Sequence, residues 1–188
     1  HAAPLAAAVP PARPARPRPR PGGPIAGGLL DITAGRLRVG DCAGAADLLE
    51  RATAFGRGDR RHGCQWRHRV RSQWLRGRLL LAADDLDGAA ACALAVVTEA
   101  GARSMPRYQA FGDLLALHVR VRRSEPPPAE QAAAVASALG EVAAMEQPWL
   151  VAQILAEATG DVREVLTSVL SDATLRLARG APDTYAPL

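Results

Sequence analysis

The sequence has no lysine and no asparagine in its 188 residues, and only 4% of its residues are aromatic. Without lysine the chain has no P-loop or kinase-type phosphate clamp and no Schiff-base nucleophile. No apolar run approaches the roughly 18 residues that cross a bilayer, so we expect no membrane-spanning segment. The hydrophobic fraction is nevertheless 48%. Because alanine and leucine supply most of it, the composition predicts closely packed helices rather than sheets.

Acidic residues are absent from residues 1–24, which hold eight prolines and four arginines. Proline fixes φ and removes a backbone donor, so this segment is predicted to be a disordered or polyproline-like linker. Its basic residues follow the small apolar stretch, which is the wrong order for a secretory signal. Since the chain starts at His1, we expect a fragment or a processed piece of a longer protein.

The net charge of +4 comes from this linker, because removing its four arginines leaves 19 arginines and 19 acidic residues. The remaining charge is unevenly spread: between Arg57 and Arg78 there are eight arginines and one acid, Asp59. We interpret this run as a solvated, structural arginine face rather than as a phosphate-binding face.

From Ile25 onward the apolar spacing is helical and repeats. Helices are predicted at 28–38, 41–55, 66–83, 85–100, 106–121, 129–144, 147–159 and 161–178. Two of them open with the frame Asp-x-x-Gly-Ala-Ala, in which Asp41 and Asp85 are plausible N-caps, and a weaker third copy begins at Asp161. Ser104 is a possible cap before Pro106. This self-similarity predicts an all-α array of about four stacked antiparallel helical hairpins.

Small residues recur where paired helices should touch. Gly77, followed by Ala89, Ala93 and Val96, resembles the small-and-apolar signature of tetratricopeptide repeats. Small side chains at such sites let two antiparallel helices approach closely.

A wider string resembles the helical-repeat regions of large actinobacterial transcriptional regulators. It runs from GRLRVGDCAGAADLLERA through WRHRVRSQWLRGRLLLAADDLDGAAACALAVVTEAGARSMPRYQAFGDLLAL. This resemblance implies a right-handed superhelix over residues 25–180, followed by a tail at 181–188. In that family the array lies between an ATPase or effector domain and a DNA-binding domain.

The arginine-rich helix at 66–83 is amphipathic, with Val70 and Trp74 on its core side. Its arginine stems can cover apolar surface while the guanidinium groups stay solvated or meet acids of the next turn, namely Asp84, Asp85 and Asp87. A helix that reads DNA needs access to the groove, which a stacked hairpin denies. Direct nucleic-acid binding is therefore not expected.

Metal binding would have to use His62, Cys64 and His68, with Cys42 and Cys92 elsewhere in the chain. Zinc sites normally show paired ligands at close spacing, and no Cys-x-x-Cys is present. We therefore expect no metal or other cofactor, and three free thiols in a reducing cytoplasm.

Catalytic motifs are equally scarce. His118 lies within an apolar helix, where a lone histidine is usually packed rather than a general base. Asp84 and Asp85 indicate a turn and an N-cap. Gly-x-Ser-x-Gly, His-Glu-x-x-His and glycine-rich phosphate loops are absent, so we do not expect an enzyme.

With nucleic-acid binding, metal binding and catalysis not expected, the remaining hypothesis is a binding surface. Its partner would be another protein or other domains of the same parent chain. Aromatic and arginine side chains are enriched at interface hot spots. The candidates are Trp66, Arg67, Arg71, Arg78, Tyr108, Phe111 and Trp149. A core role for Trp74, Phe111 and Trp149 is at least as compatible with the pattern.

The sequence thus predicts a non-enzymatic interaction or regulatory module of a larger bacterial transcriptional regulator. Two alternatives stay open. A small-molecule sensor would need an apolar pocket with convergent polar groups. A nucleic-acid scaffold would need a continuous basic stripe across several hairpins.

Overall fold

The computed structural model describes residues 22–58, 65–123, 129–144, 148–158 and 160–170, which form eight α-helices and no strand. The helices are α1 (Gly22–Arg38), α2 (Cys42–Gly58), α3 (Gln65–Ala82), α4 (Leu86–Gly101), α5 (Pro106–Arg122), α6 (Ala129–Ala144), α7 (Pro148–Glu157) and α8 (Gly160–Val169). The all-α prediction is confirmed. None of the helices in these ranges has both the length and the apolar character that crossing a bilayer requires.

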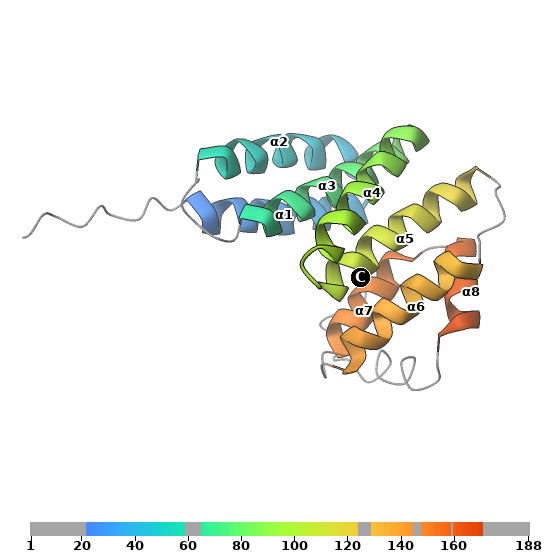
Figure 1. Ribbon diagram of the computed structural model, residues 1–188. Coiled ribbons are helices and arrows are strands. Elements are labelled where there is room, and N and C mark those ends of the chain that lie inside the picture. The colour runs from blue at the N-terminus through green and yellow to red at the C-terminus, as the bar shows by residue number, and fades with distance from the viewer. Residues whose placement is uncertain (1–21, 59–64, 124–128, 145–147, 159, 171–188) are drawn as a thin grey trace, which may run out of the picture.

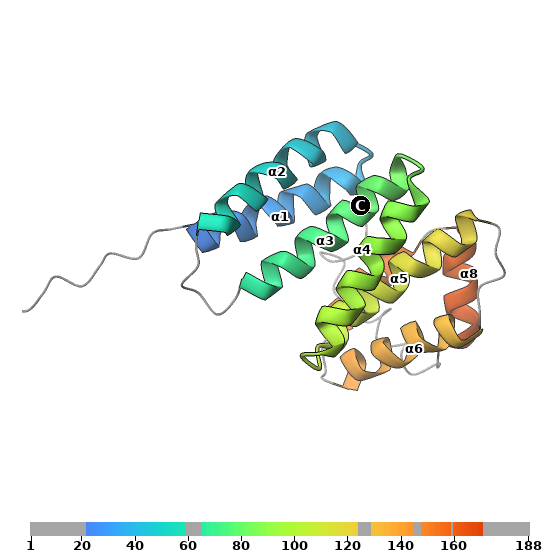
Figure 2. The same ribbon diagram turned by 45° about the horizontal axis from the view of Figure 1, so that its top comes forward.

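Neighbours in the sequence pack against one another, with α1 on α2, α3 on α4, and α5 on both α4 and α6. Figures 1 and 2 show α1 and α2 side by side at one end of the array and α6 and α8 at the other. Helix α3 is central because it contacts α1, α2, α4 and α5. One cluster of buried side chains runs through the whole array, from Leu30 through Leu75 and Leu115 to Ile154.

Helix α1 begins at Gly22, inside the segment predicted to be a linker. Pro24 is tolerated in its first turn because the N–H groups there have no partner within the helix. Most of the predicted linker, the predicted end of the last helix and the tail at 181–188 lie outside the described residues.

One predicted cap is wrong, although the predicted helix starts at 106 and 161 agree with those of α5 and α8 to within one residue. Ser104 does not cap α5: it adopts φ 51°, and the N-cap is Met105, which makes no side-chain hydrogen bond. Pro106 supplies the first residue of α5 instead, where a missing N–H costs nothing. Asp161 lies within the first turn of α8, which already begins at Gly160, so it is not the cap of that helix.

The Asp-x-x-Gly frame has a clear mechanical basis. The backbone N–H of Gly44 donates to Asp41 Oδ1 at 2.9 Å, and that of Gly88 donates to Asp85 Oδ1 at 2.9 Å. A Cβ at either glycine would collide with the capping carboxylate. Glycine therefore lets the carboxylate sit directly over the first turn, and the predicted roles of Asp41 and Asp85 are confirmed.

Gly77 marks a close approach between three helices. A Cβ there would collide with Leu115 Cδ2 of α5 and would lie 2.9 Å from Cys92 Cβ of α4. Ala89, also on α4, is fully buried. The predicted reason for small residues at these positions is therefore confirmed.

Helices α1, α3 and α5 are in register at a period of 40 residues. Asp31 of α1 forms an ion pair with Arg71 of α3, its equivalent 40 residues later. The equivalent residues Ala34, Trp74 and Leu114 are all buried. These equivalent positions lie on helices that pack side by side, α1 on α3 and α3 on α5.

Candidate functional site

The predicted contact residues lie on α3, α5 and α7. Trp66, Arg67, Arg71 and Arg78 come from α3, and Tyr108 and Phe111 come from α5. Trp149 falls in the first turn of α7, and its side chain lies outside what the structure describes. Of the other six, Trp66, Arg67 and Tyr108 belong to an exposed group, and Phe111 and Arg78 belong to an internal group. Arg71 is in neither group, because it is half-buried and pairs with Asp31 of α1.

The exposed group is built on two aromatic rings. Trp66 and Tyr108 meet edge to face, with ring centroids 5.8 Å apart and an interplanar angle of 80°. The guanidinium groups of Arg67 and Arg103 lie 5.3 and 5.2 Å from the Trp66 centroid, and that of Arg107 lies 5.7 Å from the Tyr108 ring. We call these five residues the arginine–aromatic cluster. All are at least partly exposed, so the cluster is a surface feature.

Three elements converge to make this cluster. Trp66 and Arg67 lie in the first turn of α3, and Arg107 and Tyr108 in the first turn of α5. Arg67 and Arg107 are equivalent positions in the 40-residue register. Arg103 comes from the turn between α4 and α5. Because its ring contact depends on that turn, the helical pattern of the sequence gave no signal for it.

An ion pair with Glu99 helps to hold Arg103 of the cluster in place. Glu99 accepts hydrogen bonds from Arg69 at 2.7 Å and from Arg103 at 2.9 Å, and these two bonds lower the pKa of Glu99. Partial burial lowers the pKa of Arg107, although it remains a strong base. Arginines outnumber carboxylates here, so the region carries a positive field that favours acidic groups.

The internal group contains Phe111 and Arg78. Phe111 is only 4% exposed and packs on Trp74 with ring centroids 4.5 Å apart, so it belongs to the core rather than to the exposed surface. Arg78 lies 5.4 Å from the Trp74 ring and pairs with Glu157, whose side chain is 4% exposed. The expectation that Arg78 turns to solvent or to the next turn is therefore wrong.

The acids of that next turn have other partners. Asp84 accepts from Arg122 at 2.7 Å, and Asp87 pairs with Arg123. Both arginines come from the end of α5, which lies beside the α3–α4 turn. These pairs are exposed and each contributes little to stability.

Glu157 is the centre of a buried polar network. Arg38 Nε donates to Glu157 Oε1 at 3.0 Å. His118 Nε2 lies 3.1 Å from the backbone oxygen of Glu157, and since a carbonyl only accepts, this nitrogen carries the proton. Burial lowers the pKa of His118 and of Arg78. The network joins α1, α3, α5 and α7, and its three basic members, Arg38, Arg78 and His118, are spaced by 40 residues.

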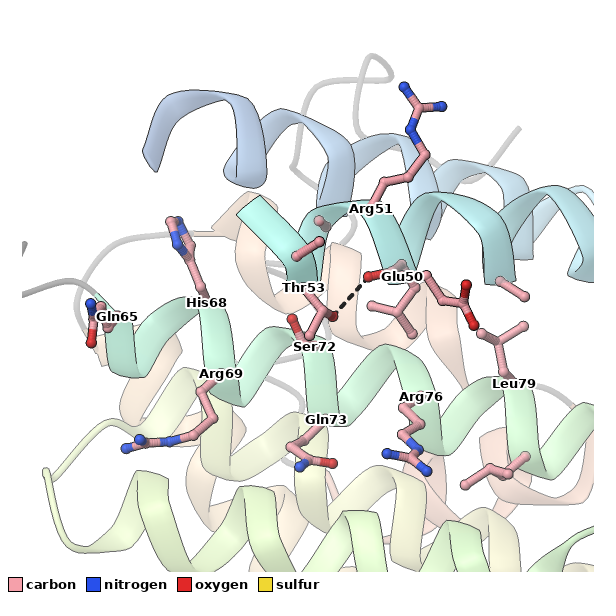
Figure 3. A pocket seen from close by; sticks show the side chains of 15 residues that line it. Glu50, Arg51, Thr53, Gln65, His68, Arg69, Ser72, Gln73, Arg76 and Leu79 are labelled. Carbon is pink, nitrogen blue, oxygen red and sulfur yellow. Dashed lines mark hydrogen bonds between the residues drawn. The ribbon is translucent and has the colours of Figure 1, made fainter. Parts of the chain in front are cut away.

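An open groove of about 1130 Å³ runs between α2 and α3. We call it the α2–α3 groove; its lining includes Leu49, Glu50, Arg69, Ser72, Arg76 and Leu80. Figure 3 shows Arg69, Gln73 and Arg76 in a row along α3, on the side away from α2. The groove is open to solvent, and its lining mixes alanines and leucines with charged groups, whereas small-molecule pockets enclose most of their ligand.

No group of three potential metal ligands converges within the described part of the chain. Of the ligands considered from the sequence, His62 and Cys64 fall outside that part. Cys42 and Cys92 are free thiols, and burial raises the pKa of Cys92. A buried, protonated thiol is a poor metal ligand and a poor nucleophile.

Comparison with protein-family models, with curated proteins and with solved structures gave no match to this chain.

Proposed function

We propose that this chain is a non-enzymatic module that binds a protein partner through the arginine–aromatic cluster. The observation that carries the proposal is the Trp66–Tyr108 pair with three guanidinium groups against its rings. Tryptophan, tyrosine and arginine are the residue types that dominate interface hot spots. Here they are held in place by ring contacts and, at Arg103, by an ion pair before any partner arrives, which reduces the ordering cost of binding.

We also propose that the helices form a tetratricopeptide-like array. The 40-residue register of α1, α3 and α5 supports a tetratricopeptide-like array, in which each hairpin presents its first helix to a partner. A place within a larger transcriptional regulator rests on the sequence resemblance alone and stays a prediction.

Site-specific photocrosslinking in the producing cells tests the proposal. A photoreactive amino acid replaces Ala102, which is exposed and next to Arg103, and in a control replaces Ala133 on the exposed side of α6. We expect a discrete protein adduct at position 102 that is absent at position 133. The adduct should disappear when Trp66 is changed to Ala or Arg67 to Glu in the same chain.

Nucleic acid is the competing partner for a basic surface. Duplex and single-stranded DNA are therefore titrated at low and at physiological salt. Binding that weakens steeply with salt, and that Arg67→Glu removes, would overturn the protein-binding proposal. An adduct that survives Trp66→Ala and Arg67→Glu would place the interaction elsewhere on the chain.

A further inference from the structure

The α2–α3 groove is a second surface, formed by a different face of α3. Its α3 residues run from Gln65 to Leu80. At 1.5 Å per helical residue this stretch is roughly 22 Å long. A groove of about 1130 Å³ over that length has a cross-section of roughly 50 Å², about half that of an α-helix 10–12 Å wide. Because the groove is open along one side, a helix can lie in it with its outer half in solvent.

Two arginines give the groove its charge. Arg69 and Arg76 are seven residues apart, so they lie on one face of α3, as Figure 3 shows. Arg76 is exposed and makes no ion pair within the described residues. Arg69 shares Glu99 with Arg103. Because a guanidinium group has five N–H donors, Arg69 can still donate to a second carboxylate.

The opposite wall contributes less charge. Arg51 of α2 points away from α3 in Figure 3 and lies 3.7 Å from Asp47, its neighbour one turn earlier. Glu50 is the carboxylate on this wall. The floor is partly apolar, with Leu49 buried and Leu79 and Leu80 half-buried. The groove therefore offers leucine contacts near the C-terminal end of α3 and positive charge along its α3 edge.

We propose that the α2–α3 groove binds an acidic amphipathic helix of another protein. The helix would carry two carboxylates seven residues apart, which face Arg69 and Arg76, and apolar residues one turn beyond the carboxylate at Arg76, which contact Leu79 and Leu80. Helix-in-groove recognition uses such i, i+3, i+4 and i+7 positions. This inference does not rest on the arginine–aromatic cluster, whose rings lie outside the groove.

A designed peptide of about 16 residues is the probe. It has an alanine and glutamine background, leucines on one face, and two glutamates seven residues apart on that face. Its isomer has the same composition with the glutamates five residues apart, on opposite faces. Fluorescence anisotropy with the full chain at low salt should show the first peptide binding at least tenfold more tightly than its isomer. Equal binding of the two peptides would overturn the proposal.

Matched variants locate the binding. Arg76→Gln should weaken it roughly threefold to fivefold, as expected for one exposed ion pair, whereas Arg120→Gln on α5 should leave it unchanged. Ala46→Trp fills the groove from an exposed position of α2 and should abolish binding, while Ala133→Trp on α6 should not. Circular dichroism confirms that each variant is folded.

Two results would reject the groove as the site. One is full binding by the Ala46→Trp chain. The other is displacement of the peptide by single-stranded DNA at physiological salt with an equal dependence on Arg76, which would assign the groove to nucleic acid. Trp66→Ala, the variant that tests the proposed function, should leave peptide binding intact, so either proposal can fail alone.

Discussion

Arg38 and Glu157 lie 119 residues apart in the sequence, and Arg38 Nε donates to Glu157 Oε1 at 3.0 Å. The same carboxylate pairs with Arg78, so one buried group ties α7 to both α1 and α3. A buried carboxylate is costly unless charged partners surround it, and here two arginines do so. This network, rather than the exposed ion pairs, is where charge contributes to the stability of the array.

Glu157→Gln should therefore destabilise the chain by about 2 kcal/mol, because it leaves the partly buried Arg78 without its counter-charge. The control is Glu141→Gln on the exposed side of α6, which should change the free energy of unfolding by less than about 0.5 kcal/mol. Urea unfolding followed by circular dichroism measures both. Equal stabilities for the two variants would show that α7 does not depend on the network.

Gly77→Ala should lower the free energy of unfolding by about 1–3 kcal/mol, because its Cβ would collide with Leu115 and crowd Cys92. Gly28→Ala is the matched control within a helix. A Cβ at Gly28 meets nothing within 4 Å, so the change should stabilise α1 by about 0.5–1 kcal/mol. Gly77→Ala should lower the midpoint temperature of thermal unfolding, and Gly28→Ala should raise it. A stabilising Gly77→Ala would mean that α3, α4 and α5 are not in close contact.

Asp113 should make stability depend on pH. It is 8% exposed, its Oδ2 has no hydrogen-bond partner among the described residues, and burial raises its pKa from 3.8 to about 6. Between about pH 4 and pH 6 the folded chain holds this proton more tightly than the unfolded chain does. Its contribution to stability is therefore greatest below pH 4, falls as pH rises and is lost above about pH 6.

Asp113→Asn removes this titration. At pH 7 the variant should be more stable than the wild type by on the order of 1 kcal/mol, and near pH 4 the difference should vanish. Unfolding free energies measured across this range give the comparison. A difference between the two chains that does not change with pH would show that the carboxyl group is not buried.

Asp85→Ala should destabilise α4 by about 1 kcal/mol, because the N–H of Gly88 loses its acceptor. Asp87→Ala, two residues later, removes an exposed carboxylate whose pair with Arg123 is worth less. Urea unfolding should therefore rank Asp85→Ala as the more damaging change. The reverse order would argue against the cap.

Local features were predictable because their causes lie within a few residues of each other. Asp41 and Asp85 were identified as caps from the first turn they precede, and the Asp-x-x-Gly frame reflects a contact between residues three apart. Ser104 was misassigned because its residue type suits a cap, whereas the turn places Met105 there. Propensity indicates where a helix starts but does not determine the path of the chain into it.

Longer-range features could not be predicted in this way. Arg103 reaches Trp66 only because the α4–α5 turn comes back beside the start of α3. Phe111 and Tyr108 lie three residues apart on α5, yet one is buried against Trp74 and the other lies on the surface. Which aromatic residue becomes core depends on the neighbouring helices, and an isolated helical pattern does not contain that information.

Local patterns in the sequence were enough to predict that the chain is helical, where most helices begin and end, and which small residues permit close packing. Periodicity, capping and side-chain size are local properties, and each acts within one helix or between adjacent ones. Which charged side chains are buried and which are exposed depends on how the helices pack. The tertiary structure buried Glu157 between Arg38 and Arg78, and it left the arginine–aromatic cluster and the α2–α3 groove exposed. The energy of a charge depends on its burial and on partners that are distant in the sequence, and both exist only once the helices have packed.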